Sequence, residues 1–202
     1  MLIRCNMPII KTLSPSDSIT ISVWKIDESL NELKRIFGKS KNINNEIKLM
    51  EHIASRLTIK YCCELIGKEY NGISKDKNGK PILNRLENGG ISISHKYPYA
   101  VGMINLKNNC GVDIERVVEK IRRIKNKFLN DKEMKYVGDD IKDITKIWSV
   151  KESTYKVEGE SVPLAKINVT RNDDDLFKSE IDNRTYSLKT IDLNGHVISF
   201  TR

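Results

Sequence analysis

The feature that most constrains the fold is an apolar stripe with helical spacing that begins at Ile43. Apolar side chains recur at steps of three and four, at positions 43, 47, 50, 53, 54, 57, 61 and 65. This spacing places them on one face of a helix, and that face needs a covering partner. We expect a long helix that Asn42 caps, that Gly67 stops and that packs on a sheet.

Stretches of alternating polarity on both sides of this helix predict the sheet. They lie at residues 19–26, 91–95, 99–105 and 110–117. Alternation with period two is typical of a half-buried strand. The Asn78-Gly79 pair and Pro81 indicate a turn ahead of the three later strands. We expect those three strands to form a small antiparallel meander.

The second half of the chain repeats the order of a long helix followed by strands. A second helical stripe covers residues 141–157, with apolar side chains at Ile144, Ile147, Trp148 and Tyr155. Three further strands are predicted at residues 166–170, 185–191 and 197–201. Between them lie an acidic turn at residues 172–175 and the turn signal Asn194-Gly195.

We therefore predict an α+β fold in which a long helix packed on a small antiparallel sheet occurs twice, as a pseudo-twofold duplication. The halves would be residues 1–108 and 109–202. Each half is small for a stable independent unit, so we expect one compact pseudo-dimeric unit with a shared interface. The cleft between two such halves is a natural place for a site.

The composition indicates a folded protein with an anionic partner. The chain has 35 Lys and Arg against 27 Asp and Glu, a formal net charge of +8, and 39% hydrophobic residues. This charge favours polyanions and acidic surfaces, without choosing between nucleic acid, a phosphorylated small molecule and an acidic protein. No apolar run is long enough for a membrane span or a signal peptide, so we expect a cytoplasmic protein with no membrane partner.

The cysteines give no indication of a metal site. Cys5, Cys62, Cys63 and Cys110 form no C-x-x-C pair, and the histidines do not lie near them at zinc-ligand spacing. A zinc site or a disulfide framework is therefore not expected. We interpret the four cysteines as small buried hydrophobic residues.

Two carboxylates stand close together in the otherwise apolar stretch G111-V-D-I-E115. In a strand, Asp113 and Glu115 would point to one face, while Val112 and Ile114 would face the core. Two such charges repel unless a cation lies between them, and Mg²⁺ prefers oxygen ligands of this kind. Taken alone, the pair is better explained by an exposed strand face that carries charges.

A third carboxylate lies on the second long helix, in W148-S-V-K-E-S-T-Y-K156. Trp148, Lys151, Glu152, Tyr155 and Lys156 are three and four residues apart, and we expect them on one side of the helix. Glu152 would complete the metal shell, and the two lysines would neutralise phosphoryl oxygens. The alternative is an exposed Glu152–Lys156 ion pair that contributes only a few tenths of a kcal/mol.

The strand at residues 91–95 and the lysine-rich turn before it could together bind an anion. Ser92 and Ser94 share one face of the strand, and His95 lies at its exit. The turn carries Lys75, Lys77 and Lys80 around Gly79, where exposed backbone amides can approach an anion. A structural histidine and solvated lysines are the alternative interpretation.

Four short motifs occur in one order along residues 79–156. They are G79-K-P81, I93-S-H95, G111-V-D-I-E115 and W148-S-V-K-E152 followed by Lys156. Each motif alone is a weak signal, but the ordered set is specific. The series resembles that of the 4′-phosphopantetheinyl transferases, of the larger Sfp-like type that activates surfactin synthetase.

The resemblance implies coenzyme A as donor and Mg²⁺ as cofactor. Its metal ligands would be Asp113, Glu115 and Glu152, with Glu152 and Lys156 as catalytic residues. The residues implied for coenzyme A are Arg56, Lys75, Gly79, Lys80, Pro81, Ser94, His95, Lys151 and Lys156. Lys75 stands where many relatives have an arginine for the 3′-phosphate, and Arg56 matches an arginine of the first long helix. The resemblance does not decide which of Lys34, Arg35, Lys39 and Lys41 touches coenzyme A.

The reaction implied by the resemblance is transfer of 4′-phosphopantetheine to a serine hydroxyl of an acyl or peptidyl carrier protein, with release of 3′,5′-ADP. The enzyme would be a monomer. An acidic carrier suits the net charge of +8. The basic segment of residues 120–127 would help to receive the carrier, or is only a solvated helix face.

Two other functions fit a basic chain with clustered carboxylates. A Mg²⁺-dependent nuclease would often have an acidic-x-Lys step on the metal strand, which Glu115-Arg116-Val117 does not provide. A non-catalytic nucleic-acid-binding domain would leave the three carboxylates unexplained, and only 6% of the residues are aromatic and available for base stacking. We therefore expect no nucleic-acid partner.

Overall fold

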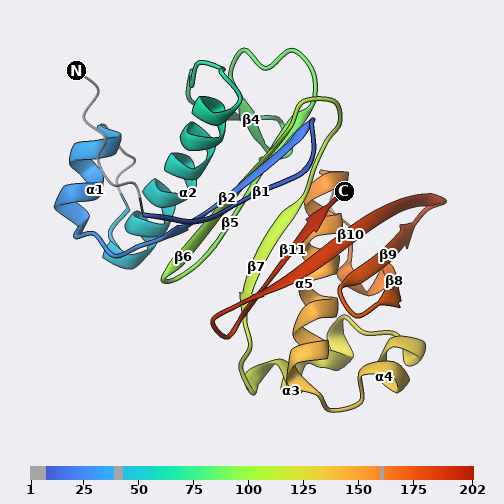
Figure 1. The fold of residues 1–202 in the computed structure, drawn as a ribbon. Coiled ribbons are helices and arrows are strands. Elements are labelled where there is room, and N and C mark those ends of the chain that lie inside the picture. Colours follow the sequence, from blue (N-terminus) through green and yellow to red (C-terminus); the bar gives the residue numbers. More distant parts are fainter. Residues whose placement is uncertain (1–7, 39–42, 160–161) are drawn as a thin grey trace.

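The two long helices lie on the outside of two sheets that pack against each other (Figure 1). A computed structural model describes residues 8–38, 43–159 and 162–202. Helix α2 (Glu46–Leu65) covers one sheet, and helix α5 (Ile141–Glu158) covers the other. The layers therefore run helix, sheet, sheet, helix, which confirms the α+β class.

The first sheet has four antiparallel strands in the order β1-β2-β6-β5. Its strands are β1 (Ile9–Ser16), β2 (Ile19–Lys25), β5 (Gly90–Lys96) and β6 (Tyr99–Asn105). The second sheet has five antiparallel strands in the order β7-β11-β10-β9-β8. Its strands are β7 (Val112–Arg116), β8 (Asn168–Asp173), β9 (Leu176–Ile181), β10 (Arg184–Leu193) and β11 (His196–Thr201).

Shorter elements complete the fold around these layers. They are helix α1 (Leu30–Phe37), the hairpin of β3 (Ile73–Lys75) and β4 (Pro81–Leu83), helix α3 (Lys120–Ile124), helix α4 (Asp131–Val137) and 3-10 turns at Lys125–Lys127 and Leu164–Lys166. The β3–β4 hairpin lies beside the sheet edge formed by β5. It therefore borders the place where the two halves meet.

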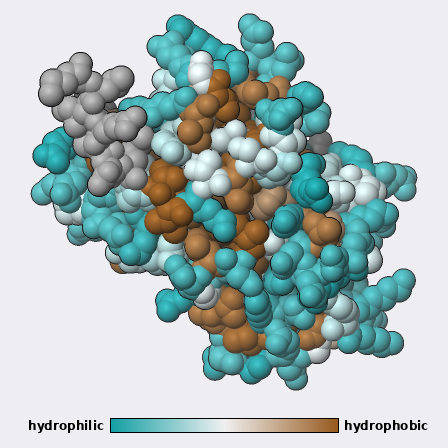
Figure 2. All heavy atoms as spheres, viewed as in Figure 1, coloured by the Kyte–Doolittle hydropathy of each residue, from teal (hydrophilic) through white to brown (hydrophobic). Residues whose placement is uncertain are grey.

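The core between the sheets joins the two halves into one unit. Strand β2 alternates, so Ile21 and Val23 face the second sheet while Trp24 faces α2. Val112 and Phe200 enter the same core from the other sheet. Burial of each such side chain contributes about 1.5–3 kcal/mol, which would be lost if the sheets separated. Figure 2 shows apolar residues gathered near the middle of one face and hydrophilic residues around them.

Helix α2 begins later than the sequence pattern predicted. Its first residue is Glu46, and the side chain of Asn45 accepts a hydrogen bond from the backbone N–H of Lys48. The predicted cap, Asn42, lies outside the described residues. The end at Leu65 is confirmed, with Gly67 at φ +67° just beyond it.

The expected three-strand meander is wrong. Strand β7 leaves the first sheet and pairs with β11 in the second. A Cβ on Gly111, the residue before β7, would lie 1.9 Å from the carbonyl oxygen of Ser153 on α5. Glycine therefore lets the chain run directly against α5, which draws β7 into the sheet under that helix.

The last third of the chain has one more strand than predicted. Strand β9 forms hairpins with β8 and β10, and the acidic stretch around residues 173–175 is the first of the two turns. Phe177, Ser179 and Ile181 alternate as buried side chains along β9, so the period-two signal was present in the sequence. The strands at 19–26, 91–95 and 99–105 and the helix at 141–157 are confirmed.

The described cysteines are buried and unpaired, as expected. Cys62, Cys63 and Cys110 are free thiols with no exposed surface, and Cys5 lies outside the described residues. Burial raises the pKa of Cys62 and of Cys110 to about 12. In the described part of the chain, no helix combines the length and the apolar character that a membrane crossing requires.

Candidate functional site

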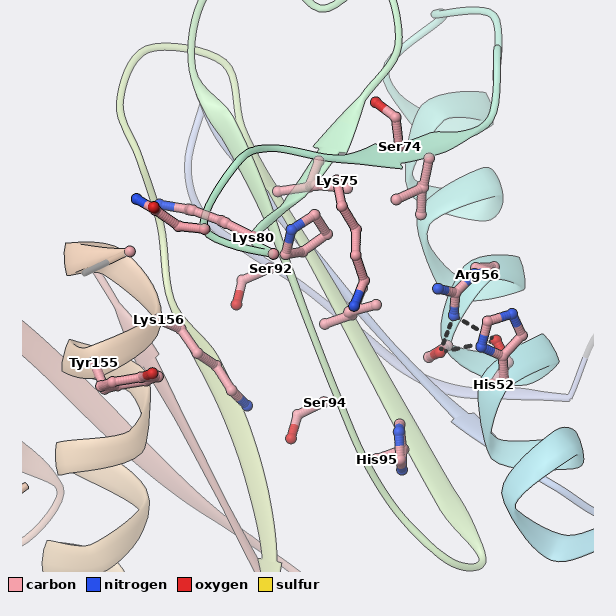
Figure 3. A pocket seen from close by; sticks show the side chains of 18 of the residues that line it. His52, Arg56, Ser74, Lys75, Lys80, Ser92, Ser94, His95, Tyr155 and Lys156 are labelled. Carbon is pink, nitrogen blue, oxygen red and sulfur yellow. Dashed lines mark hydrogen bonds between the residues drawn. The ribbon is translucent and has the colours of Figure 1, made fainter. Parts of the chain in front are cut away.

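A cleft of 870 Å³ lies where the two halves meet (Figure 3). Its walls come from α2, the β3–β4 hairpin and β5 in the first half, and from the end of α5 in the second. The lining residues are Phe37, His52, Ser55, Arg56, Ile73, Ser74, Lys75, Asn78, Gly79, Lys80, Pro81, Ile91, Ser92, Ile93, Ser94, His95, Tyr155, Lys156 and Gly159. Its volume is in the range that small-molecule and cofactor sites occupy.

The cleft is lined by basic groups. Arg56, Lys75, Lys80, His95 and Lys156 all face it, and no Asp or Glu occurs among the described residues that line it. Positive charge concentrated in a concave site attracts anions more strongly than the same charge spread over a surface. The arrangement favours a ligand with several negative charges.

Arg56 is held in the cleft by its own helix. Its Nη1 donates to the backbone oxygen of His52 at 2.9 Å and to Oγ of Ser55 at 3.4 Å. Burial lowers its pKa, and no carboxylate within the described residues forms an ion pair with it. A guanidinium stays charged at neutral pH, so Arg56 offers an uncompensated positive charge to a ligand.

The lysine-rich turn forms the opposite wall of the cleft. Oδ1 of Asp76 accepts hydrogen bonds from the backbone N–H of Asn78 and of Lys80, and Gly79 has a φ of +84°. Nζ of Lys80 donates to the backbone oxygen of Val157, the penultimate residue of α5, at 2.9 Å. Lys80 therefore links the hairpin of the first half to the end of α5.

Neighbouring residues of β5 reach different partners. Oγ of Ser94 donates to Oδ1 of Asp113 on β7 at 2.8 Å. His95 turns toward α2, where its Nδ1 lies 3.3 Å from Oε2 of Glu51. Because β5 is the edge strand of the first sheet, its side chains connect the cleft to both halves.

Asp113 is the most enclosed of the three predicted metal ligands, with 3% exposure. Its Oδ1 accepts from Ser94 and from Nζ of Lys156 at 2.8 Å, and its Oδ2 accepts from Oγ of Ser149 at 3.0 Å. Nζ of Lys156 also donates to the backbone oxygen of Val112. Lys156 thus lines the cleft and neutralises a carboxylate behind it.

Glu115 lies on the same strand face and has its own cation. Its Oε2 is 2.7 Å from Nζ of Lys96, and its Oε1 accepts from Nε1 of Trp148 at 3.3 Å. Val112 and Ile114 are buried between the sheets. The predicted alternation of residues 112–115 is therefore confirmed.

Glu152 lies in an environment that disfavours its negative charge. Burial, with the added repulsion of Asp113 and Glu115, raises its pKa to about 7, although Lys156 acts in the opposite direction. Within the described residues Glu152 accepts no hydrogen bond, and Lys156 pairs with Asp113 instead of with Glu152. The simple exposed Glu152–Lys156 ion pair considered from the sequence is absent from this described region.

The expectation that Lys151 shares the helix face of Glu152 and Lys156 is wrong. Its side chain is fully buried, with Nζ 2.7 Å from Oε2 of Glu133 and 2.6 Å from the backbone oxygen of Phe128. Lys151 is one residue before Glu152, a rotation of about 100° around the helix, and it points toward α4. It joins α5 to α4 and does not line the cleft.

The three carboxylates fit a divalent cation by their chemistry. They supply oxygen donors, and burial together with the nearby charges of Asp113 and Glu115 raises the pKa of Glu152. Across residues 8–38, 43–159 and 162–202, no group of three or more His, Cys, Asp or Glu side chains is already placed to hold a metal ion. Lys156 and Lys96 occupy Asp113 and Glu115 in this arrangement.

The structure brings together nearly all of the residues that the sequence predicted for coenzyme A. Those that line the cleft are Arg56, Lys75, Gly79, Lys80, Pro81, Ser94, His95 and Lys156, and Lys151 is the exception. Lys34 and Arg35 on α1 do not line it, whereas Phe37 of the same helix does. Lys39 and Lys41 lie outside the described residues.

Several residues near the site were missed by the sequence analysis. Lys96 and Ser149 contact the carboxylates, and Glu51 contacts His95. Ser149 lies inside the motif W148-S-V-K-E152, so its position was a usable signal. Glu51 had none, because its contact with His95 joins residues that are far apart in the sequence.

Comparison with known proteins points to the second half of the chain. Residues 109–201 match the family model described as the 4′-phosphopantetheinyl transferase superfamily. A similar solved structure is that of Helicobacter pylori holo-[acyl-carrier-protein] synthase in complex with coenzyme A, with 15% identity and a TM-score of 0.40. The similarity covers 46% of this chain and 96% of that chain. No curated protein matches the sequence.

Proposed function

We propose that this chain is a 4′-phosphopantetheinyl transferase that uses coenzyme A to modify a serine of a carrier protein. One observation carries the proposal: Lys156 lines a basic cleft and also bonds Asp113, one of three neighbouring carboxylates. A basic cleft binds the phosphates of a donor, and the carboxylates at its edge suit a metal and a base. The family match of residues 109–201 supports the same reaction.

Coenzyme A would lie in the cleft with its nucleotide toward the first half. Arg56, Lys75 and His95, which line the cleft, would meet nucleotide phosphates, and the Gly79-Lys80-Pro81 turn would meet the adenine side. Lys156 would meet the pyrophosphate, because it is the cleft lysine that also contacts the carboxylates. Lys151 is left out of this assignment because it is buried against Glu133.

Asp113, Glu115 and Glu152 would hold Mg²⁺. When bound, the ion would neutralise charge on the two phosphates and on the departing 3′,5′-ADP. Lys156 and Lys96 now supply part of that neutralising charge to Asp113 and Glu115. Lys156 would be free to contact the pyrophosphate once another cation satisfies Asp113.

In the reaction, the serine oxygen of the carrier forms a bond to the β-phosphorus of coenzyme A. The bond from that phosphorus to the bridging oxygen breaks, and 3′,5′-ADP leaves with the electron pair. Glu152, directly or through a water, would accept the serine proton. Lys156 stabilises the leaving phosphate, so most of the catalysis comes from positioning and charge neutralisation.

We further propose that the chain is of the Sfp-like type, with residues 1–108 and 109–202 as pseudo-twofold halves. Each half contributes one long helix on one antiparallel sheet, and the cleft lies where they meet. This division would give the first half the nucleotide side and the second half the metal and the catalytic helix. We propose that it acts as a cytoplasmic monomer.

The carrier would approach over the basic segment of residues 120–127. Arg122 and Lys125 are engaged locally, because they donate to the backbone oxygens of Asp139 and Gly138. Within the described residues, the side chains of Lys120, Arg123 and Lys127 form no hydrogen bond or ion pair. These three remain available for an acidic partner.

The experiment that tests the function is incubation of the protein with an apo-carrier protein, coenzyme A and Mg²⁺, followed by intact mass measurement. A phosphopantetheine adduct on the carrier that requires all three additions is the expected result. Incubation of the same preparation with single-stranded and double-stranded nucleic acid examines the alternatives. Cleavage would indicate a nuclease, binding without cleavage would indicate a nucleic-acid-binding domain, and either result without an adduct overturns the proposal.

A further inference from the structure

Glu51 lies behind the cleft and contacts one of its basic residues. It is on α2, its side chain is 12% exposed, and it is not among the residues that line the cleft. Its Oε2 is 3.3 Å from Nδ1 of His95, and its Oε1 accepts a hydrogen bond from the backbone N–H of Tyr97 at 2.8 Å. One carboxylate therefore binds both the side chain of His95 and the turn that follows it.

This contact decides which ring nitrogen of His95 is offered to a ligand. A carboxylate beside Nδ1 keeps the proton on that nitrogen and leaves Nε2 for the other side of the ring. The side chain of His95 is 42% exposed and lines the cleft, as Figure 3 shows. A phosphate oxygen at Nε2 would then accept a hydrogen bond from that nitrogen while Glu51 holds Nδ1.

The contact also fixes where His95 lies. His95 is near the end of the edge strand β5, where the sheet alone provides a neighbour on one side only. Glu51 anchors the strand end to α2 from the helix side, on the same helix as Arg56. A ligand phosphate would then meet two basic groups whose separation is set by one rigid element.

We infer that Glu51 is a positioning residue for the phosphate site: it orients His95 for the nucleotide of the donor without touching the ligand. The inference rests on the proposed function for the identity of that ligand. The effect that this role predicts on ligand affinity is opposite in sign to that of direct electrostatic repulsion between Glu51 and the ligand. A carboxylate near a polyanion should weaken binding, whereas a carboxylate that acts through His95 should strengthen it.

The test is a double-mutant cycle with 3′,5′-ADP as the probe and isothermal titration calorimetry as the measurement. Glu51→Gln should raise the Kd by about fivefold, the upper end of what a partly exposed ion pair contributes. In a His95→Ala background the same substitution should change the Kd by less than a factor of about 1.5, because the cycle isolates coupling between the two residues. Glu64→Gln, on an exposed site of the same helix, is the matched control and should have no effect.

A spectroscopic measurement separates positioning from general damage to the fold. Long-range proton–nitrogen spectra of the ligand-free protein should place the His95 proton on Nδ1, and Glu51→Gln should shift it toward Nε2. The His95→Ala variant assigns the signal among the three histidines of the chain.

The inference is overturned by tighter binding in Glu51→Gln, by an equal loss in the His95→Ala background, or by an unchanged His95 spectrum. Because 3′,5′-ADP binding needs no carrier, failure of the inference about Glu51 can be distinguished from failure of the transferase proposal. If the cycle shows the coupling but the wild-type protein modifies no carrier, only the transferase proposal is overturned. If the wild-type protein modifies carriers but the cycle shows no coupling, only this inference is overturned.

Discussion

The two halves of the molecule have the same layers and different charge. Residues 1–108 contain 17 Lys and Arg against 10 Asp and Glu, a net charge of +7, whereas residues 109–202 contain 18 against 17, a net charge of +1. Most of the basic groups that line the cleft come from the first half. All three neighbouring carboxylates come from the second. Under the proposed function, the first half would bind the anion and the second would supply the chemistry.

The two long helices differ in what they bury. Helix α2 buries mainly apolar side chains, such as Leu49, Ile53 and Leu57. Helix α5 also buries hydroxyl groups, and Ser149 and Ser153 both bond the Oγ of Ser199 on β11. Buried polar groups must be paired, so they fix the helix in one position on its sheet. Helix α2 also buries the hydroxyls of Ser55 and Thr58, but these bond backbone oxygens of their own helix and do not tie it to its sheet.

The largest expected effect tests the assignment of chemistry to the second half. Glu152→Gln should lower the rate of carrier modification by about 10³-fold, within the range for loss of a general base. The Kd for 3′,5′-ADP should stay within about twofold, because Arg56, Lys75 and His95 are untouched. Mass-based initial rates and calorimetry measure the two quantities, with Glu180→Gln on the exposed face of β9 as control. A comparable collapse of nucleotide binding would break the division between the halves.

The same substitution should make the metal-free protein more stable. The pKa of Glu152 is raised from 4.5 to about 7, so the folded state holds the proton more strongly than the unfolded state does. Ionised Glu152 thus costs stability, and the cost grows as pH rises from 4.5 to about 7 and is constant above that. At pH 8 we expect Glu152→Gln to gain about 2–3 kcal/mol in urea unfolding, and to gain almost nothing at pH 4. A constant gain at both pH values would contradict the electrostatic cause.

A smaller effect tests the binding role of the first half. Arg56→Ala should raise the Kd for 3′,5′-ADP by about tenfold through loss of a charge-assisted contact, with kcat within about twofold of wild type. Lys60→Ala, one turn further along α2 and outside the cleft, is the control. A fall in kcat with unchanged affinity would mean that Arg56 serves catalysis and not nucleotide binding, which contradicts the division between the halves.

The link between the halves should contribute modestly to stability. Lys80→Met removes the hydrogen bond from Nζ to the backbone oxygen of Val157 and should lower the free energy of unfolding by about 1 kcal/mol. Lys77→Met, on the exposed side of the same turn, should change it by much less. Urea unfolding of the ligand-free protein measures both. Equal losses would mean that the core between the sheets holds the two halves together without a contribution from Lys80.

The smallest expected effect concerns the carrier. The double substitution Arg123→Glu with Lys127→Glu should raise the KM for an acidic carrier by about threefold at low salt, and the difference should shrink as salt screens the charges. The KM for coenzyme A should not change. Equal carrier KM values at low salt would remove the basic segment from the docking surface.

Much of the fold was predictable because its signals are local. The apolar spacing of 141–157 and the alternation of 99–105 define a helix and a strand without reference to any other part of the chain. The meander was mispredicted because strand pairing is not local: residues 110–117 look equally suited to either sheet. The contact of Gly111 with α5 is what assigns β7 to the second sheet.

The candidate site was predictable to the extent that one element carries its geometry. Asp113 and Glu115 share a strand face, and this follows from a period of two. Lys151 was misplaced because being three residues from Trp148 does not put a side chain on the face of Glu152. Its partner, Glu133, comes from α4, a helix that the sequence analysis did not anticipate.

The sequence by itself determined the chemistry available to this protein: its carboxylates, its basic groups and the order of its helices and strands, because residue types and short-range periodicity are written along the chain. Only the tertiary structure decided which groups meet. It turned Lys156 toward Asp113, buried Lys151 against Glu133 and set Glu51 beside His95. These contacts join residues distant in sequence, and their geometry follows from how the sheets and helices pack, which no local pattern encodes.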